Sequence, residues 1–477
     1  ISSSYSSNTL ASFLSRLEYK FNNRYLLTLN FRADGSSQFG PDKRWGYFPS
    51  GAVAWIITEE NFMKDYSNIV SYLKLRGSVG KTGSQNLGAY DWRTLMGSAT
   101  YNGAAGIVPS SLGNDILQWE EQIQKEVGLD YGFWDDRIRG TLGYYQKKVD
   151  NLLYSDPVPT SSSFSSVYQN IGSLKNRGIE FDVRVDIIKN VQKDLTWNVD
   201  FNIARNRTTL EKLNSSDGYF GGGAYDYFKI EEGGETGRFY GYKDAGRLFM
   251  TNEELVGLKT IDPKTGTLKY YRDDYNYERQ GDVYIMDLDG DGQITADGDR
   301  TVIGNANPDF FGGFGSTLYW KGLMLNAVFS YSVGGDRFWD EEKNSSGDMN
   351  VYNTSNRILD SWTVNPGVNA SYPRAMYYGW GSNSIITDRY IHDASYLRMT
   401  ALNLSYRLPK HLYKNSILNA VEFTFQATNL FTWTKYPGMD PQGNFSTTYS
   451  AFYNMGIDYS TYPSARTYNF GIKLTLK

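Results

Sequence analysis

The strongest constraint on the fold is an alternation of apolar and polar residues with a period of two. Between residues 179 and 187 the apolar positions are Ile179, Phe181, Val183, Val185 and Ile187, and charged residues stand between them. The same alternation runs through residues 25–34, 197–203, 421–426 and 468–476. Successive side chains of a strand point to opposite faces of a sheet, so each segment has one apolar and one polar face. The pattern predicts an all-β fold.

The amino-acid composition excludes several classes of protein and of functional site. The chain has no cysteine and two histidines, which excludes a disulfide framework, a zinc–thiolate site and a cysteine nucleophile. The net charge of −4 argues against a nucleic-acid partner. No apolar run approaches the roughly 18 residues of a transmembrane helix, and the mean hydropathy is −0.51. One interpretation of the alternation is therefore a large soluble β-sandwich.

Two features favour a membrane-spanning β-barrel instead. First, short and long connections alternate along the chain. The short ones are near 22–23, 135–136, 189–193 and 321–322, and the long ones are near 81–115, 151–171, 207–308, 336–392 and 433–464. Second, aromatic residues gather at the strand ends, namely Trp45, Tyr47, Trp55, Phe133, Trp134, Tyr319, Trp320, Phe431 and Trp433. Outer-membrane barrels have short turns at one end, long loops at the other and aromatic girdles at both interfaces.

About 13 segments have the length of barrel strands. They lie near 10–21, 24–34, 46–57, 70–80, 118–133, 138–150, 173–188, 195–206, 309–320, 323–334, 394–408, 419–431 and 465–477. Bacterial barrels have an even number of strands, and an open sheet edge cannot be exposed to lipid. We therefore expect residues 1–477 to be the C-terminal part of one longer barrel, with 207–308 and 336–392 as long extracellular segments.

Short sequence motifs spread over the whole chain resemble the SusC/RagA family of TonB-dependent outer-membrane transporters of Bacteroidetes. They are residues 24–28 (RYLLT), 32–40 (RADGSSQFG), 45–50 (WGYFPS), 73–80 (LKLRGSVG), 170–172 (NIG), 176–180 (NRGIE), 281–283 (GDV), 287–300, 303–305 (IGN), Pro308, 312–314 (GGF), 396–398 (YLR), 429–431 (NLF) and 462–466 (YPSAR). Each motif is weak alone, and their order along the chain carries the resemblance.

The resemblance implies a barrel of about 22 strands in the outer membrane of a Gram-negative cell. It also implies a plug and a TonB box in the N-terminal part of the same protein. The implied function is import of a glycan, oligosaccharide or peptide, energised by TonB. A SusD-like surface lipoprotein is the implied extracellular lid. The sequence leaves open whether the substrate is a glycan or a peptide.

One motif has the residue types of a metal-binding loop. Asp287, Asp289 and Asp291 are followed by Gly292 and, after Gln293, by an apolar residue, as at the start of an EF-hand loop. Position 12 is Gly298 instead of Glu, and the flanking Asp297 and Asp299 are candidates to replace it. The motif predicts a Ca²⁺ site that rigidifies segment 207–308, and its candidate ligands are Asp287, Asp289, Asp291, Gln293, Asp297 and Asp299. The alternative is a turn whose carboxylates are solvated or paired with Arg300.

No pattern in the chain predicts an enzyme. Adjacent acidic pairs occur at 120–121, 231–232, 253–254 and 273–274, but neighbours in a strand face opposite sides and cannot form a glycosidase pair. No phosphate-binding loop or nucleophile elbow is present. Aromatic loop residues are candidates to stack on sugar rings or to bind peptides. They are Trp92, Tyr101, Tyr377, Tyr378, Trp380, Phe445 and Tyr449.

The sequence therefore favours a transporter. The alternative from a different class is a secreted or surface-attached β-rich protein that binds glycans or acts as an adhesin without transport.

Overall fold

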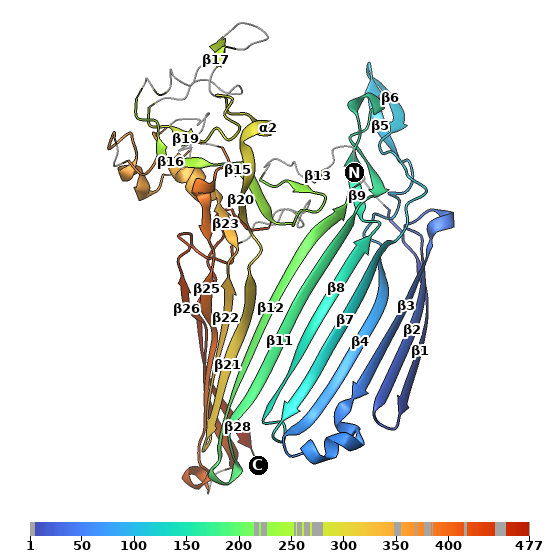
Figure 1. The fold of residues 1–477 in the computed structure, drawn as a ribbon, viewed down its shortest axis with the longest axis vertical. Helices are drawn as coiled ribbons and strands as arrows, with labels where there is room; N and C mark the ends of the chain where they lie inside the picture. Colours follow the sequence, from blue (N-terminus) through green and yellow to red (C-terminus); the bar gives the residue numbers. More distant parts are fainter. Residues whose placement is uncertain are drawn as a thin grey trace.

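The computed structural model describes residues 5–213, 219–220, 227–251, 254, 260–261, 268–269, 280–347, 354–367, 370–375, 383, 385–414, 417–443 and 455–476. Within these residues, 13 strands form one antiparallel sheet in which each strand pairs with the next one along the chain (Figure 1). They are β1 (Leu10–Phe21), β2 (Tyr25–Ser36), β3 (Trp45–Ile56), β4 (Val70–Ser84), β7 (Glu120–Phe133), β8 (Ile138–Asp150), β11 (Ser173–Asn190), β12 (Leu195–Lys212), β21 (Phe310–Trp320), β22 (Leu323–Val333), β25 (Tyr396–Arg407), β26 (Leu418–Thr434) and β28 (Thr467–Leu476). The predicted all-β fold with about 13 barrel strands is confirmed.

The sheet has one apolar and one polar face, as the alternation predicted. Phe181 pairs with Ile203 and Val185 with Val199, whereas Asp182 pairs with Asn202. The register continues the apolar face across the later strands, where Phe314 stacks on Phe329 at 4.6 Å between ring centroids. Many large apolar side chains of this face are exposed to the surroundings, which is how a lipid-facing surface is built.

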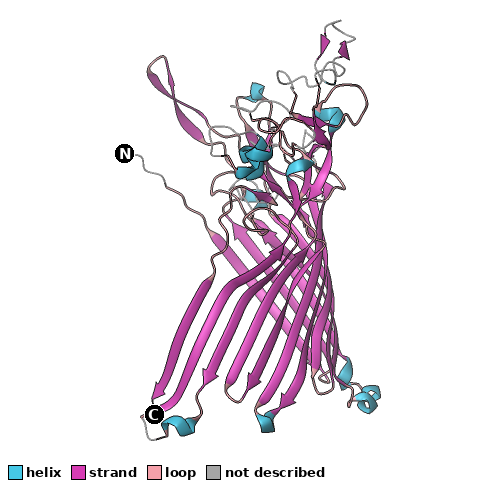
Figure 2. Ribbon diagram, turned by 90° about the vertical axis from the view of Figure 1, so that its left-hand side faces the viewer, coloured by secondary structure: helices cyan, strands magenta, loops and turns pink. Residues whose placement is uncertain are grey.

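The connections at one end of the sheet are short (Figure 2). Asn22, Asn23, Asp135 and Asp136 have φ values of 50–58°, and Lys321 with Gly322 has φ values of 47° and 87°. Asn, Asp and Gly tolerate this left-handed region, so turns of two to four residues join β1 to β2, β7 to β8 and β21 to β22. The longer connections at this end contain 3₁₀ turns, namely η2 (Ile57–Glu59), η3 (Asn61–Tyr66), η5 (Val191–Lys193) and η9 (Lys410–Tyr413).

Long connections form a separate layer at the other end of the sheet (Figures 1 and 2). Its strands form small sheets of two or three strands. They are β5 (Met96–Tyr101), β6 (Ala104–Pro109), β9 (Leu153–Pro157), β10 (Ser166–Asn170), β13 (Tyr219–Phe220), β14 (Ile230–Glu231), β15 (Arg238–Tyr242), β16 (Asp244–Leu248), β17 (Thr260–Ile261), β18 (Leu268–Lys269), β19 (Val283–Ile285), β20 (Arg300–Asn305), β23 (Asp336–Trp339), β24 (Ile391–Asp393) and β27 (Ile457–Asp458). The helices are α2 (Ala296–Asp299) and α3 (Asp340–Glu342).

The long segments predicted at 207–308 and 336–392 join β12 to β21 and β22 to β25. β12 runs on to Lys212, because its upper end still pairs with Ser173 and Leu174 of β11. The two segments and the connection after β26 share a buried apolar core of Tyr227, Phe228, Phe239, Ala306, Phe338, Tyr390 and Ile457. Among the described helices, none is both long and apolar enough to cross a membrane.

Candidate functional site

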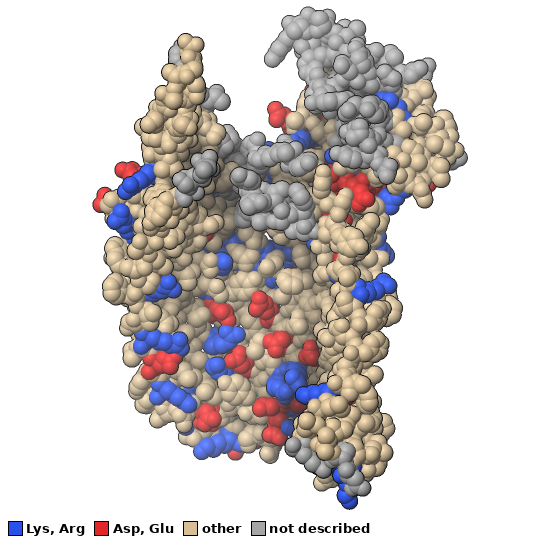
Figure 3. Space-filling view, turned by 180° about the vertical axis from the view of Figure 1, so that it is seen from behind, with Lys and Arg blue, Asp and Glu red and all other residues tan. Residues whose placement is uncertain are grey.

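The polar face of the sheet carries an ion-pair network across β4 and β7. The Arg76 Nε lies 3.1 Å from the Asp130 carboxylate, and Lys74 Nζ lies 3.3 Å from the same carboxylate. Arg76 also forms an ion pair with Glu126. Acidic and basic side chains gather on the hollowed side of the molecule (Figure 3). This surface is suited to contact with water, a polar substrate or another polar protein surface.

A cavity of about 400 Å³ lies on the same face, near the loop layer. Its polar lining includes Arg16, Arg32 and Lys81, with Asp34 as the single carboxylate. The Arg32 Nε donates to Asp34 Oδ1 at 2.8 Å. Phe48 and Trp119 form its apolar wall, with ring centroids 5.5 Å apart. Each of the three cations pairs with a carboxylate, Arg16 with Glu18, Arg32 with Asp34 and Lys81 with Glu121. The cavity therefore offers paired charges and an aromatic wall, which suit a hydroxyl-bearing group.

A buried ion pair joins the loop after β26 to the mouth of the sheet, which is the end of the sheet that carries the long connections. Arg398 of β25 and Asp440 are 4% and 5% exposed, and Arg398 Nη2 donates to Asp440 Oδ1 at 2.6 Å. The Gln442 and Ser464 amides donate to the same carboxylate at 2.9 and 3.2 Å. Burial alone raises the pKa of Asp440, but the hydrogen bonds from Gln442, Arg398 and Ser464 outweigh it and hold that pKa below its usual range.

A second polar cluster lies beneath the loop layer. Tyr436 donates its hydroxyl to Asp458 Oδ2 at 2.8 Å, and burial beside that carboxylate raises the pKa of Tyr436. The tyrosine therefore stays protonated and keeps donating. Nearby, His392 Nε2 lies 2.5 Å from Glu342 Oε2, and Glu342 also pairs with Arg357. These contacts satisfy buried carboxylates. The rings of Trp339 and His392 contact the Tyr436 ring and join segment 336–392 to the segment that follows β26.

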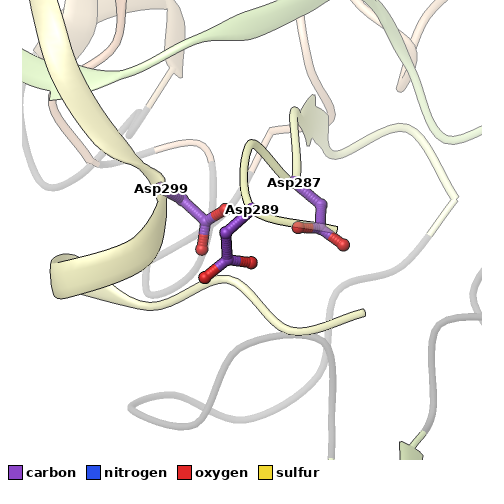
Figure 4. Close-up of side chains that lie close together, drawn as sticks. All are labelled: Asp287, Asp289 and Asp299. Atoms are coloured by element: carbon purple, nitrogen blue, oxygen red, sulfur yellow. The ribbon is translucent and has the colours of Figure 1, made fainter. Parts of the chain in front are cut away.

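The Asp-rich loop brings together three of the six predicted metal ligands (Figure 4). One carboxylate oxygen each of Asp287, Asp289 and Asp299 lies within 4.8 Å of the others. Asp287 accepts from the Gly290 and Gly292 amides at 2.7 and 2.8 Å. Asp299 is fully buried and accepts from the Leu288 and Thr295 amides, both at 2.7 Å. The backbone thus holds two of the carboxylates in place around the loop.

Two of the other predicted ligands, Asp291 and Asp297, lie outside this group, and a ligand role for Gln293 stays a prediction. Asp291 and Asp297 are exposed, and Asp291 Oδ1 accepts from the Gln293 amide at 2.7 Å. Of the two residues that flank Gly298, the structure therefore places Asp299 in the cluster and leaves Asp297 outside. A Cβ atom at Gly298 would stand 2.2 Å from Asp289 Oδ2, so a Glu at this position would require the Asp289 side chain to move.

The electrostatics of the group favour a cation. The Asp291 amide lowers the pKa of Asp289, but desolvation and the neighbouring carboxylates of Asp291, Asp299 and Asp287 outweigh that hydrogen bond. The net result is a raised pKa, since negative charges close together disfavour one another. Carboxylate oxygens in this number and spacing are ligands that Ca²⁺ accepts.

The predicted aromatic substrate ligands are mostly outside the described residues, namely Tyr377, Tyr378, Trp380, Phe445 and Tyr449. Tyr101 ends β5, on a hairpin that projects from the loop layer. Trp92 packs against a core of Phe39, Phe48, Leu117 and Trp119, and its Nε1 donates to the Ser37 carbonyl at 3.2 Å. Its indole therefore contributes to loop packing, and its role in substrate binding stays a prediction.

Comparison with known proteins shows to which family the chain belongs. A model of the TonB dependent receptor-like β-barrel matches residues 1–380. The chain belongs to this family. TonB-dependent receptors of this kind are outer-membrane proteins and not enzymes, which confirms the predicted location and the predicted resemblance.

Several relatives of the TonB-dependent receptor family match almost the whole chain. TonB-dependent receptor P3 of Formosa agariphila is 33% identical, over 99% of this chain and 46% of its own length. TonB-dependent receptor SusC of Bacteroides thetaiotaomicron is 32% identical, over 98% of this chain and 44% of its own length. The structure of the RagAB peptide transporter is similar over 98% of this chain and 48% of its own, with a TM-score of 0.76 and 27% identity. The chain thus spans about half the length of these relatives.

Sequence reasoning did not find the pairing of Arg398 with Asp440. Arg398 stands out only as part of a family-like motif, and nothing local relates it to a residue 42 positions away. The pairing arises because the loop after β26 folds back over the mouth of the sheet.

Proposed function

We propose that this chain forms the C-terminal part of a TonB-energised outer-membrane importer of glycans or peptides that works with a SusD-like lipoprotein lid. The observation that carries the proposal is a single meandering sheet with a lipid-facing apolar side and a charged inner side. Its likeness to SusC and to a peptide transporter supports an import function. The TonB box and plug belong to the N-terminal part that the resemblance implies. The secreted adhesin alternative is set aside, because the family is one of membrane barrels.

Uptake by cells tests this proposal. The full-length receptor is tagged and purified with its associated lipoproteins, and the molecules bound to it are identified by mass spectrometry. We expect a surface lipoprotein and a saccharide or peptide to copurify. Uptake of that ligand should then stop when TonB or the lipoprotein is deleted. Uptake that persists without TonB would mean a passive channel, which contradicts the proposal.

We also propose that Asp287, Asp289 and Asp299 bind Ca²⁺. Their spacing, the buried position of Asp299 and the raised pKa of Asp289 support it. A cation would offset the repulsion among the carboxylates and join β19 to α2, which stand on either side of the loop. Binding to the folded state alone stabilises a protein in proportion to the logarithm of the ligand concentration.

Asp289→Asn is expected to weaken Ca²⁺ binding by about tenfold or more, because it removes one charged ligand from a site that depends on ligand charge. The measurement is calorimetric titration of Ca²⁺ into the chelator-treated full-length receptor. Asp297→Asn is the matched control, since Asp297 is exposed and outside the group. The control should bind like the wild type. No Ca²⁺ uptake by the wild type would refute the site.

A further inference from the structure

A row of basic side chains crosses the outward face of the sheet on β7, β11 and β12, with the neutral Gln146 of β8 between them. Lys125 of β7 pairs with Gln146 of β8, Gln146 pairs with Arg177 of β11, and Arg177 pairs with Arg207 of β12. Arg205 pairs with Ile179 one step below. These positions continue the apolar side of their strands, which contains Val127, Tyr144, Ile179 and Ile203. The cations therefore face away from the lumen.

Three of these cations have no partner among the residues that the structure describes. Lys125, Arg177 and Arg205 are exposed, and none of their side chains forms an ion pair or hydrogen bond with any residue of the described ranges. Their neighbours differ in this respect. Lys148 and Lys175 both pair with Glu211, and Arg207 pairs with Asp309 at 3.0 Å. A cluster of like charges repels itself unless an anion lies nearby, so the three free cations mark a surface that attracts an anion.

An apolar groove of about 650 Å³ begins beside Lys125 and Gln146. Leu27, Leu29, Val53, Val79, Val127 and Tyr144 line it. Gly51 and Gly77 form its floor, and a Cβ at Gly77 would meet only one backbone oxygen, at 3.8 Å. The groove is therefore a hollow on the lipid-facing surface, at the place where Gly51 and Gly77 have no side chains. Its apolar lining suits a hydrocarbon chain.

The depth of the row fits the upper edge of the membrane. Arg205 follows Leu195, at the lower end of β12, by ten residues. At about 3.4 Å per residue and a strand tilt of about 40°, this is a height of about 26 Å. The lipid-facing apolar band of outer-membrane barrels is about 25 Å tall. With the short turns toward the periplasm, the row lies where outer-leaflet headgroups begin.

We propose that this surface binds an acylated, phosphate-bearing lipid of the outer leaflet, with the phosphate on Lys125, Arg177 and Arg205 and an acyl chain in the groove at Gly77. Arg and Lys both pair with phosphate oxygens, and each cation near a membrane surface adds to the attraction of anionic lipid. The lipid would stay bound against β7, β8, β11 and β12. On these strands the outward-facing side chains at this height are basic instead of aromatic.

The test is native mass spectrometry of the delipidated full-length receptor titrated with dioleoyl phosphatidic acid or dioleoyl phosphatidylcholine. We expect the wild type to bind the phosphatidic acid about tenfold more tightly. K125Q/R177Q/R205Q should lose that preference. Its matched control is K20Q/K43Q/K64Q, which removes three exposed cations elsewhere and should keep the preference. Gly77→Leu fills the groove and should weaken binding of both lipids.

Four results would contradict the proposal. The first is equal binding of both lipids by the wild type, and the second is an equal loss of preference in the control triple variant. The third is displacement of phosphatidic acid by inorganic phosphate, which would identify a site for the free anion. Unchanged binding by Gly77→Leu would also contradict an acyl chain in the groove. Each variant is first checked for folding by heat-modifiable migration on gels, so that a folding defect is not mistaken for lost binding.

Discussion

Replacing Arg398 by Met is expected to free the loop after β26 from the mouth of the sheet. Arg398 and Asp440 are both buried, and the variant leaves the Asp440 carboxylate without its cation. Removing one partner of a buried ion pair costs about 3–5 kcal/mol, because the remaining charge stays desolvated. Two amides, from Gln442 and Ser464, donate to this carboxylate and report on its environment.

Hydrogen exchange of the full-length receptor in detergent measures this effect. We expect the Gln442 and Ser464 amides to exchange about a hundredfold faster or more in Arg398→Met, within the limit set by global unfolding. Arg398→Met with Asp440→Asn removes both charges and should recover much of the protection. Arg16→Met, which breaks an exposed ion pair with Glu18, is the control and should change little. Unchanged exchange at both amides in the single variant would contradict the argument.

The same ion pair predicts a dependence on pH. Folding lowers the pKa of Asp440, so its contribution to stability is present above the ordinary aspartate pKa of about 3.9 and is lost as pH falls through the lowered value. The difference in exchange between wild type and Arg398→Met should therefore persist at neutral pH and shrink in strong acid. A difference that grows on acidification would mean that Asp440 is not charged in the native protein.

The strands could be predicted from the sequence because a period of two is a local property. Each strand needs only its own residues to show which side is apolar, as Ile179 to Val185 do. The pairing order also followed, because short turns such as residues 22–24 force consecutive strands to be neighbours. The upper end of β12 was misjudged, since Thr208 to Lys212 have no clear alternation and join the sheet by pairing with β11.

The candidate site was less predictable, because its contacts join residues far apart in the chain. The spacing of the Asp-rich motif identified Asp287 and Asp289, but only the turn into α2 decides that Asp299 joins them. Trp92 has the composition of a ligand-stacking residue, yet its neighbours Phe39 and Leu117 come from other loops and surround it as a core. The groove at Gly77 is likewise formed by five neighbouring strands, β2, β3, β4, β7 and β8, and no one of them shows it in its own sequence.

Val199→Arg is expected to prevent stable insertion of the receptor. Val199 lies on the apolar face of β12, between Val185 and Ser316 of the adjacent strands. It follows Leu195 by four residues, which places it about 10 Å above the lower end of the strand and near the middle of the apolar band. An arginine at the bilayer midplane on this face destabilises the inserted barrel by about 2–4 kcal/mol. The reason is that the guanidinium must either lie in hydrocarbon or bring water into the membrane.

Asn198→Arg is the matched control, one residue away on the opposite face. Its neighbours across the strands are Asp186 and Thr317, so the added cation would lie in the wet lumen beside a carboxylate. We expect this variant to stay within about 0.5 kcal/mol of the wild type. The measurements are the amount of full-length receptor in the outer membrane and its unfolding by urea in detergent micelles. If both variants lose the same stability, the two faces of β12 do not meet different solvents, and the assignment of lipid and lumen sides is wrong. Because the same parity defines the outward face from β7 to β12, that outcome would also remove the lipid site at Lys125, Arg177 and Arg205.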